Sequence, residues 1–114
     1  MHSMLEVDVN VRPCLIDKFF VPKEAAEEFL NRMNYNRDFI RKLPGFIGDK
    51  AYHNVDDVGN LHIITIAEWE SPKYFADARN AVQSEYKRIG FDIATFASRL
   101  GITMERALYN VMDI

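Results

Sequence analysis

Three side chains in the sequence could take part in chemistry without any special motif around them. Trp69 is the only tryptophan, and its indole N–H needs a polar partner when the ring is buried, which a carbonyl group or a ligand could supply. His62 carries the side chain type that titrates closest to neutral pH and could act as a base, although the sequence does not identify a partner for it. Asp17, between apolar neighbours, is either a buried proton acceptor or a salt-bridged interface residue, and we favour the second interpretation.

Two further candidates lie next to each other in a predicted strand. Tyr52 and His53 point to opposite faces of that strand, so only one of them can face a pocket on a given side. The other is expected at a pocket rim or at an interface with a second subunit. Arg88 lies near the end of a predicted helix, where a cation complements the helix dipole.

Several common chemistries have no matching pattern in the sequence. It contains no phosphate-binding glycine loop, no cysteine and histidine pattern at metal-ligand spacing, and no serine on a nucleophile elbow. Cys14, the one cysteine, lies in a predicted buried strand and is expected to behave as a small apolar residue. We therefore predict neither a bound metal nor a cofactor.

The composition narrows the class of protein. A chain of 114 residues suits one domain, which would remove roughly two-thirds of its unfolded surface from water. The net charge of -3 gives no basic surface for nucleic acid, and a single cysteine cannot form an internal disulfide. No run of about 18 apolar residues suggests a membrane span, so we expect a cytoplasmic protein without a membrane partner.

The elements that would position these side chains centre on residues 59–72. Beta-branched residues from Ile63 to Ile66 predict a strand, and Ser71 followed by Pro72 predicts the start of a helix. Alternation places one set of residues on each face of the strand. One face carries Leu61, Ile63, Thr65, Ala67 and Trp69, and the other carries His62, Ile64, Ile66, Glu68 and Glu70.

The remaining elements follow from periodicity and from turn residues. Residues 14–21 and 46–54 predict strands, and residues 105–112 predict the last strand. Helices are predicted after Pro22 and from Pro72 to Gly90, with a short helix between Asp92 and Gly101. Residues 1–13, in which Leu5, Val7, Val9 and Val11 alternate with polar residues, predict an extended arm before a domain of residues 14–114.

This order of elements predicts an α+β fold of the ferredoxin-like type, with four antiparallel strands and helices on one face. The strands are apolar on both faces, however. Leaving Ile64 and Ile66 in water would forfeit several kcal/mol at about 25 cal/mol per Å² of apolar area. We therefore predict a homodimer in which a second sheet covers the open face.

Three short motifs resemble the antibiotic biosynthesis monooxygenase family. They are Pro44-Gly45-Phe46 at the end of the first helix, Ala51-Tyr52-His53 before the turn, and Trp69-Glu70-Ser71 at the strand-to-helix junction. The resemblance covers residues 15–111 and implies a dimeric α+β barrel. The family includes cofactor-free oxygenases of aromatic polyketide phenols, haem-degrading enzymes and members without a known reaction. The predicted helix at 72–90 lacks the tryptophan and histidine that the haem-degrading enzymes have there.

The resemblance also implies a site. Thr65 stands where the polyketide-oxidising members have asparagine, Phe75 stands where they have tyrosine, and Arg88 approximately matches a basic residue at the far end of the helix. Trp69, Arg88 and His53 are the implied catalytic residues. The implied substrate-binding residues are Thr65, Phe75, Tyr52 and Ile63.

Two functions remain open at this point. The first is a cofactor-independent monooxygenase that oxidises a small aromatic, phenolic or quinone-forming substrate with dioxygen. The second is a non-catalytic or stress-related dimeric barrel that binds a small apolar ligand.

Overall fold

The computed structural model describes residues 11–112, so most of the predicted arm lies outside the described residues. The chain forms one four-stranded antiparallel sheet with three α-helices. The elements are β1 (Pro13–Val21), a 3₁₀ turn η1 (Lys23–Ala25), α1 (Ala26–Ile40), β2 (Phe46–Val55), β3 (Leu61–Trp69), α2 (Pro72–Ile89), α3 (Ile93–Leu100) and β4 (Thr103–Asn110).

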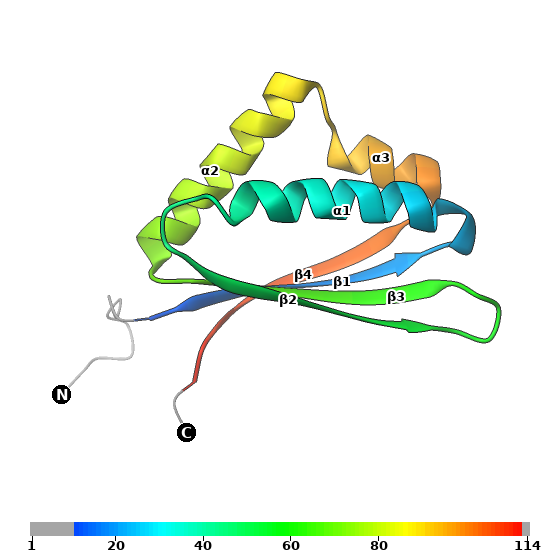
Figure 1. The fold of residues 1–114 in the computed structure, drawn as a ribbon, viewed down its shortest axis with the longest axis horizontal. Coiled ribbons are helices and arrows are strands. Elements are labelled where there is room, and N and C mark those ends of the chain that lie inside the picture. The colour runs from blue at the N-terminus through cyan, green and yellow to red at the C-terminus, as the bar shows by residue number, and fades with distance from the viewer. Residues whose placement is uncertain (1–10, 113–114) are drawn as a thin grey trace.

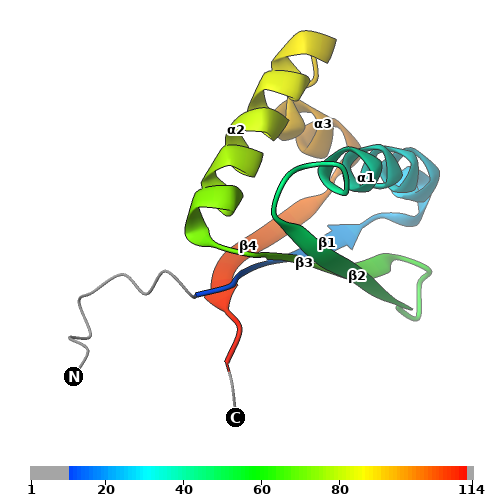
Figure 2. The same ribbon diagram turned by 60° about the vertical axis from the view of Figure 1, so that its left-hand side comes forward.

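The sheet has the strand order β2-β3-β1-β4, with every neighbouring pair antiparallel. All three helices lie on the same face of this sheet (Figure 1). A view turned by 60° shows the same layering, with the opposite face left uncovered by the described residues (Figure 2). The predicted ferredoxin-like architecture is therefore confirmed.

The core lies between the sheet and the first helix. Its buried members come from β1, η1, α1, β3 and the residue just before β4, and α3 packs against them. They are Val21, Ala25, Phe29, Ile63 and Ile102, with Phe19, Leu30, Met33, Leu61, Phe96, Ala97 and Leu100 partly buried around them. Ile93, at the start of α3, is exposed.

The caps predicted for the second and third helices are present. The Ser71 hydroxyl accepts a hydrogen bond from the Tyr74 N–H at 3.3 Å, and Pro72 occupies the first turn of α2. The Asp92 carboxylate accepts from the Thr95 N–H at 3.1 Å at the start of α3. Gly90 ends α2 in the left-handed conformation, with φ of 69°.

The last strand differs from its prediction by two residues at each end. It runs over Thr103–Asn110 and not over 105–112. The physical reason is pairing, because Thr103 is opposite Phe20 and Asn110 is opposite Pro13, so the length of β1 sets the limits of β4. Local sequence patterns carry no information about this long-range pairing.

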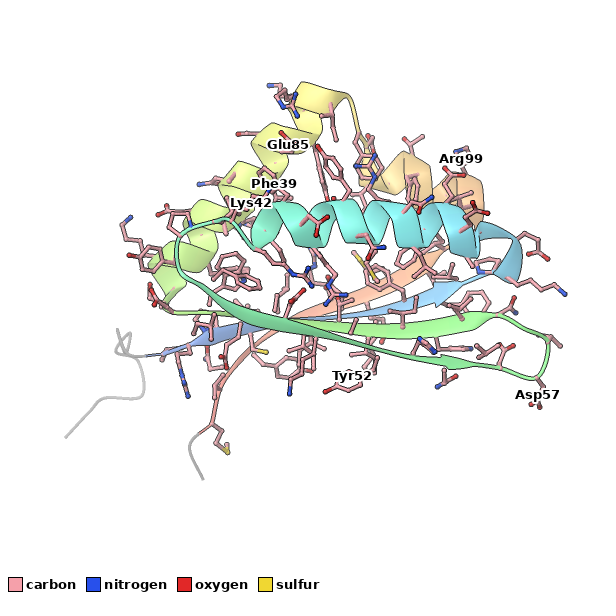
Figure 3. All side chains as sticks on the ribbon, in the orientation of Figure 1. Phe39, Lys42, Tyr52, Asp57, Glu85 and Arg99 are labelled. Carbon is pink, nitrogen blue, oxygen red and sulfur yellow. The ribbon has the colours of Figure 1, made fainter. Side chains whose placement is uncertain are left out.

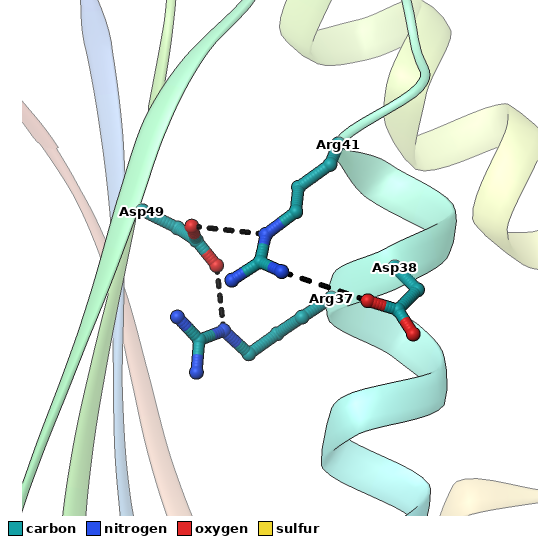
Figure 4. Close-up of polar contacts among 4 residues, drawn as sticks. All are labelled: Arg37, Asp38, Arg41 and Asp49. Atoms are coloured by element: carbon teal, nitrogen blue, oxygen red, sulfur yellow. Dashed lines mark hydrogen bonds and ion pairs between the residues drawn. The ribbon is translucent and has the colours of Figure 1, made fainter.

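The C-terminal end of α1 is anchored to β2 by a charged cluster. The Asp49 carboxylate accepts from Arg37 Nε at 2.6 Å and from Arg41 Nε at 3.4 Å (Figure 4). Burial raises the pKa of Asp49, but the hydrogen bonds and charges of Arg37 and then Arg41 outweigh it and leave the pKa below its usual value. This anchor holds α1 over the helix-facing side of the sheet.

The uncovered face of the sheet, called the open face below, carries many apolar side chains. Alternation assigns to it the even-numbered residues of β1 and β3, as the burial of Val21, Ile63 and Trp69 on the other face requires. Figure 3 shows Tyr52 pointing away from the helices on this side. The apolar residues of the open face include Ile16, Phe20, Tyr52, Ile64, Ile66 and Tyr109.

Candidate functional site

Trp69 lies at the end of β3 on the face that the helices cover. Its side chain is almost fully buried, with 3% of its surface exposed. The ring meets Phe46 of β2 edge to face, with the ring centroids 5.5 Å apart. Phe75 follows in the first turn of α2, half-buried, with its N–H bonded to the Ser71 carbonyl. The two aromatic residues that the sequence predicts therefore lie at one strand-to-helix junction.

Thr65 lies on the same face of β3 as Trp69 and beside a partly buried ion pair. Its partner across the β1–β3 ladder is Asp17, a buried charged residue. Arg106 of β4 donates to both Asp17 oxygens, from Nε at 2.7 Å and from Nη2 at 2.8 Å. The salt bridge predicted for Asp17 is confirmed, but the prediction that it belongs to a subunit interface is wrong, because Asp17 faces the helices.

A tyrosine and a second arginine extend this pair toward the helices. Burial raises the pKa of Tyr86 of α2, while the charges of Arg106 and Arg32 and a hydrogen bond with Asn36 oppose the shift. Arg32 of α1 has a buried Nη1 without a hydrogen-bond partner. The five residues Asp17, Arg32, Asn36, Tyr86 and Arg106 are called the interior polar cluster below.

This cluster can stabilise negative charge. A tyrosine hydroxyl is neutral at physiological pH, and burial raises the pKa of Tyr86 further, so this hydroxyl can act as a donor. Arg106 is held in place by Asp17, whose hydrogen bonds also raise the pKa of the guanidinium. Donors that are fixed before reaction and partly shielded from water stabilise a developing oxyanion better than mobile surface groups do.

The sequence did not point to most of these residues. Tyr86 falls within the helix predicted from Pro72 to Gly90, but no local pattern marks Tyr86, Arg32 or Arg106 as a site residue. Asp17 and Arg106 are 89 residues apart in sequence, and the pairing of β1 with β4 brings them together. The one available clue was Asp17 itself, a carboxylate between apolar neighbours.

The predicted residues Tyr52, His53 and Ile63 border a different space. They line a cavity of about 530 Å³, called the open-face cavity below, together with Lys18, Phe20, His62 and Glu105 among others. The Tyr52 side chain is exposed on the open face, whereas His53 belongs to the helix-facing side by alternation and is exposed on the edge strand. Ile63 is part of the buried core.

His62 has a partner that the sequence did not reveal. Its Nε2 lies 3.0 Å from Asp56 Oδ2, and the N–H groups of Val58 and Asn60 donate to Asp56 Oδ1. The His62 hydrogen bond, followed by that from Asn60, lowers the pKa of Asp56. A histidine paired with a carboxylate can exchange protons at the rim of the open-face cavity.

Arg88 lies on the exposed side of α2. It donates to Glu85 twice, from Nε at 2.7 Å and from Nη2 at 2.8 Å. Arg88 is not among the residues that line the open-face cavity or that form the interior polar cluster. Glu85 also accepts a hydrogen bond from the Tyr35 hydroxyl of α1. The structure therefore places Arg88 in a link between α1 and α2, and its catalytic role stays a prediction.

Two further features concern metal-ligand residue types and the thiol of Cys14. Within residues 11–112, no group of three or more histidine, cysteine, aspartate or glutamate side chains is arranged to hold a metal ion. Burial, with a smaller effect of Glu68, raises the pKa of Cys14, so its thiol stays protonated. No helix in this part of the chain is long and apolar enough to cross a membrane.

No protein-family model and no curated protein sequence matches the chain. Solved structures do match it. A candidate monooxygenase from Shewanella loihica PV-4 superposes with a TM-score of 0.68 at 23% identity, covering 94% of this chain and 100% of that one. SnoaB, a cofactor-independent oxygenase from Streptomyces nogalater, gives a TM-score of 0.67 at 21% identity, with 91% and 96% covered.

A third match is a dimeric ferredoxin-like protein from an uncultured marine organism. It has a TM-score of 0.68 at 7% identity, covering 91% of this chain and 99% of that one. These similarities extend over nearly the whole chain but at low identity, so they define a shared fold. The resemblance to antibiotic biosynthesis monooxygenases is confirmed at that level.

Proposed function

We propose that the chain is a cofactor-independent monooxygenase that oxidises a small aromatic, phenolic or quinone-forming compound with dioxygen. The observation that carries the proposal is the interior polar cluster, which holds Arg106, Tyr86 and Arg32 between the sheet and the helices. The fold shared with SnoaB supports it further, because that protein is a cofactor-independent oxygenase.

The proposed reaction needs a substrate that can lose a proton to form an electron-rich anion. This anion gives one electron to dioxygen, and the resulting radical pair combines through a new carbon–oxygen bond. Protonation of the peroxide and loss of water, with cleavage of the remaining C–H bond at that carbon, leave a carbonyl group. One oxygen atom of O₂ enters the product and the other enters water.

The residues of this chain would act on the first and last steps. Tyr86 and Arg106 donate to the substrate oxygen and stabilise its anion, while Trp69, Thr65 and Phe75 shape an apolar wall that limits water. We assign charge stabilisation to Arg106 and not to Arg88, since Glu85 holds Arg88 on the exposed side of α2. His53 remains the proposed proton-handling residue, with Ile63 as a proposed substrate neighbour. Tyr52 points away from the helices, so we do not place it beside a substrate that is bound between the sheet and the helices.

We also propose that the protein acts as a homodimer. The open face carries Ile64, Ile66 and Phe20 with no covering element among the described residues. These side chains are already partly buried in the single chain, so burying the rest of each one against a second sheet would contribute less than the roughly 1.5–3 kcal/mol of a fully exposed side chain. The dimeric ferredoxin-like protein from the marine organism has the same fold, which is compatible with this assembly.

A second candidate function is binding without turnover. Thr65 and Phe75 favour it, because each lacks the polar group that the monooxygenase resemblance expects at its position. A pocket with fewer donors would still bind an apolar molecule.

An oxygen-uptake screen of hydroxyarenes, with protein treated to remove metal and flavin, separates the two functions. The monooxygenase predicts uptake that depends on the protein and falls roughly 10²-fold in Tyr86→Phe and Trp69→Phe. The matched control is Tyr74→Phe, which removes a hydroxyl from an exposed tyrosine of the same helix. Including Arg88→Gln and His53→Gln tests their predicted roles. Tight aromatic binding without uptake would support the binding protein and reject the monooxygenase.

A further inference from the structure

A groove between α1 and α3 lies beside the interior polar cluster and shares Arg32 with it. It has a volume of about 400 Å³ and is called the α1–α3 groove below. This size lies within the range of roughly 300–1,000 Å³ that is typical of small-molecule pockets. Its lining residues are Glu28, Asn31, Arg32, Tyr35, Phe91, Phe96 and Arg99.

One wall of the groove is aromatic. Phe91 and Phe96 meet with ring centroids 5.2 Å apart, and Tyr86 supports Phe91 from behind with centroids 5.0 Å apart. Tyr35 adds a further ring from α1. A planar aromatic ligand would find ring faces and edges of the kind that give offset or edge-to-face packing.

The charge of the groove is positive. Arg99 is paired with Glu28, so these two charges offset each other. Arg32 has no carboxylate partner within residues 11–112; its guanidinium carbon lies 4.0 Å from the Phe91 ring centroid and 5.0 Å from that of Tyr35. Its Nη1 is buried and makes no hydrogen bond.

Arg32 differs in this respect from the other arginines around it. Arg37, Arg99 and Arg106 each bind a carboxylate of the chain. A guanidinium offers five N–H donors in a plane, and a carboxylate or phenolate is the partner that matches this geometry. Stacked between two rings, Arg32 is already oriented for such a partner.

We infer that the α1–α3 groove binds a small planar aromatic anion. The ring packs on Phe91 and Phe96, and the carboxylate or phenolate oxygen accepts from Arg32, with Arg99 at the opposite lip. The inference does not rest on the oxygenase reaction, because binding is measured without turnover and oxygen uptake can be absent while binding is present. The two proposals can therefore fail separately.

The test is isothermal titration with 2-naphthoate and with its uncharged counterpart 2-naphthamide. We expect naphthoate to bind one site per chain with a Kd below about 1 mM, and at least about tenfold more tightly than the amide. Backbone amide shifts should map to residues 28–35 and 91–99. Equal affinity for the two probes, shifts confined to the sheet, or no naphthoate binding would overturn the inference.

Two variants locate the charge. Arg32→Gln should weaken naphthoate binding by roughly tenfold and leave naphthamide binding nearly unchanged. Because Arg32 is partly buried, Arg99→Gln provides a second variant on an exposed residue, and it should also weaken naphthoate binding by leaving the Glu28 carboxylate unpaired. The matched control is Arg79→Gln, which removes an exposed charge from α2 outside the groove. Unchanged naphthoate affinity in both groove variants would contradict the inference.

Discussion

At the scale of single residues, the interior of the chain is organised by charged groups that the sequence places far apart. Asp17 lies between apolar neighbours in the sequence, and this position predicts a salt bridge. Its partner Arg106 could not be predicted, since the partnership depends on the pairing of β1 with β4. The roles of Tyr86 and Arg32 could not be predicted either, because the residue pattern of one helix does not indicate which polar groups of other elements it contacts.

The Asp17→Asn variant tests the energetic value of this pair. It keeps the shape of the side chain but removes the charge that Arg106 binds, so we expect a loss of about 2 kcal/mol in the free energy of unfolding. Urea unfolding of Asp17→Asn, Arg106→Gln and the double variant measures the coupling. A loss smaller than about 0.5 kcal/mol would show that the pair contributes little.

The Glu85 carboxylate supplies a pH-dependent prediction. Hydrogen bonds from Arg88 and then Tyr35 lower its pKa from 4.5 to about 2 in the folded chain. A pKa depressed by folding means that the stabilisation is complete above about pH 4.5 and is lost as the pH falls toward 2. Carboxyl carbon NMR should therefore find Glu85 still ionised at about pH 3.

The matched variants for this prediction are Arg88→Gln and Arg79→Gln. The first should return the Glu85 pKa most of the way to its ordinary value, and the second should leave it depressed. An ordinary pKa for Glu85 in the unmodified chain would show that the link between α1 and α2 does not form in solution.

At the scale of elements, local sequence signals were strong. The strand-to-helix junction at Ser71 and Pro72 and the helix ends at Gly90 and Gly101 all appear where predicted. These helix ends can be predicted from the sequence because caps and left-handed glycines depend on a few neighbouring residues. The limits of β4 could not be predicted from local patterns, because pairing with β1, which is far away in the sequence, determines them.

A glycine series tests the packing at one of these junctions. Gly45 has a φ of 81°, and a Cβ atom there would collide with the ring of Tyr74. Gly90 also has a positive φ but open space around it, and Gly48 has neither constraint. We expect Gly45→Ala to cost more than about 2 kcal/mol, Gly90→Ala about 1 kcal/mol, and Gly48→Ala less than about 0.5 kcal/mol.

Thermal or urea unfolding of the three variants gives this order directly. If Gly45→Ala were no worse than Gly90→Ala, then Tyr74 would not pack against the turn before β2 as the structure describes.

At the scale of the whole molecule, the sequence established that both faces of the sheet are apolar, and the structure covers only one of them. The alternation in β3 that predicted this is confirmed, with Ile63 and Trp69 under the helices and Ile64 and Ile66 on the open face. The homodimer is our proposal for what covers the open face.

Sedimentation velocity of Ile66→Lys tests the homodimer. We expect the unmodified chain to sediment as a dimer at micromolar concentration, and Ile66→Lys to shift it toward a folded monomer because an unpaired charge would be buried in the interface. Val58→Lys, at the exposed turn between β2 and β3, is the control and should remain dimeric. A monomeric unmodified chain would contradict the assembly.

The function itself is tested most directly by following the oxygen atoms. In an atmosphere of ¹⁸O₂, with protein free of metal and flavin and a hydroxyarene that supports oxygen uptake, mass spectrometry counts the label in the product. The proposed reaction predicts one ¹⁸O atom per turnover in the product and one in water, with the yield lowered in Tyr86→Phe. Product oxygen that comes from water, or turnover no faster than in heat-denatured protein, would contradict it.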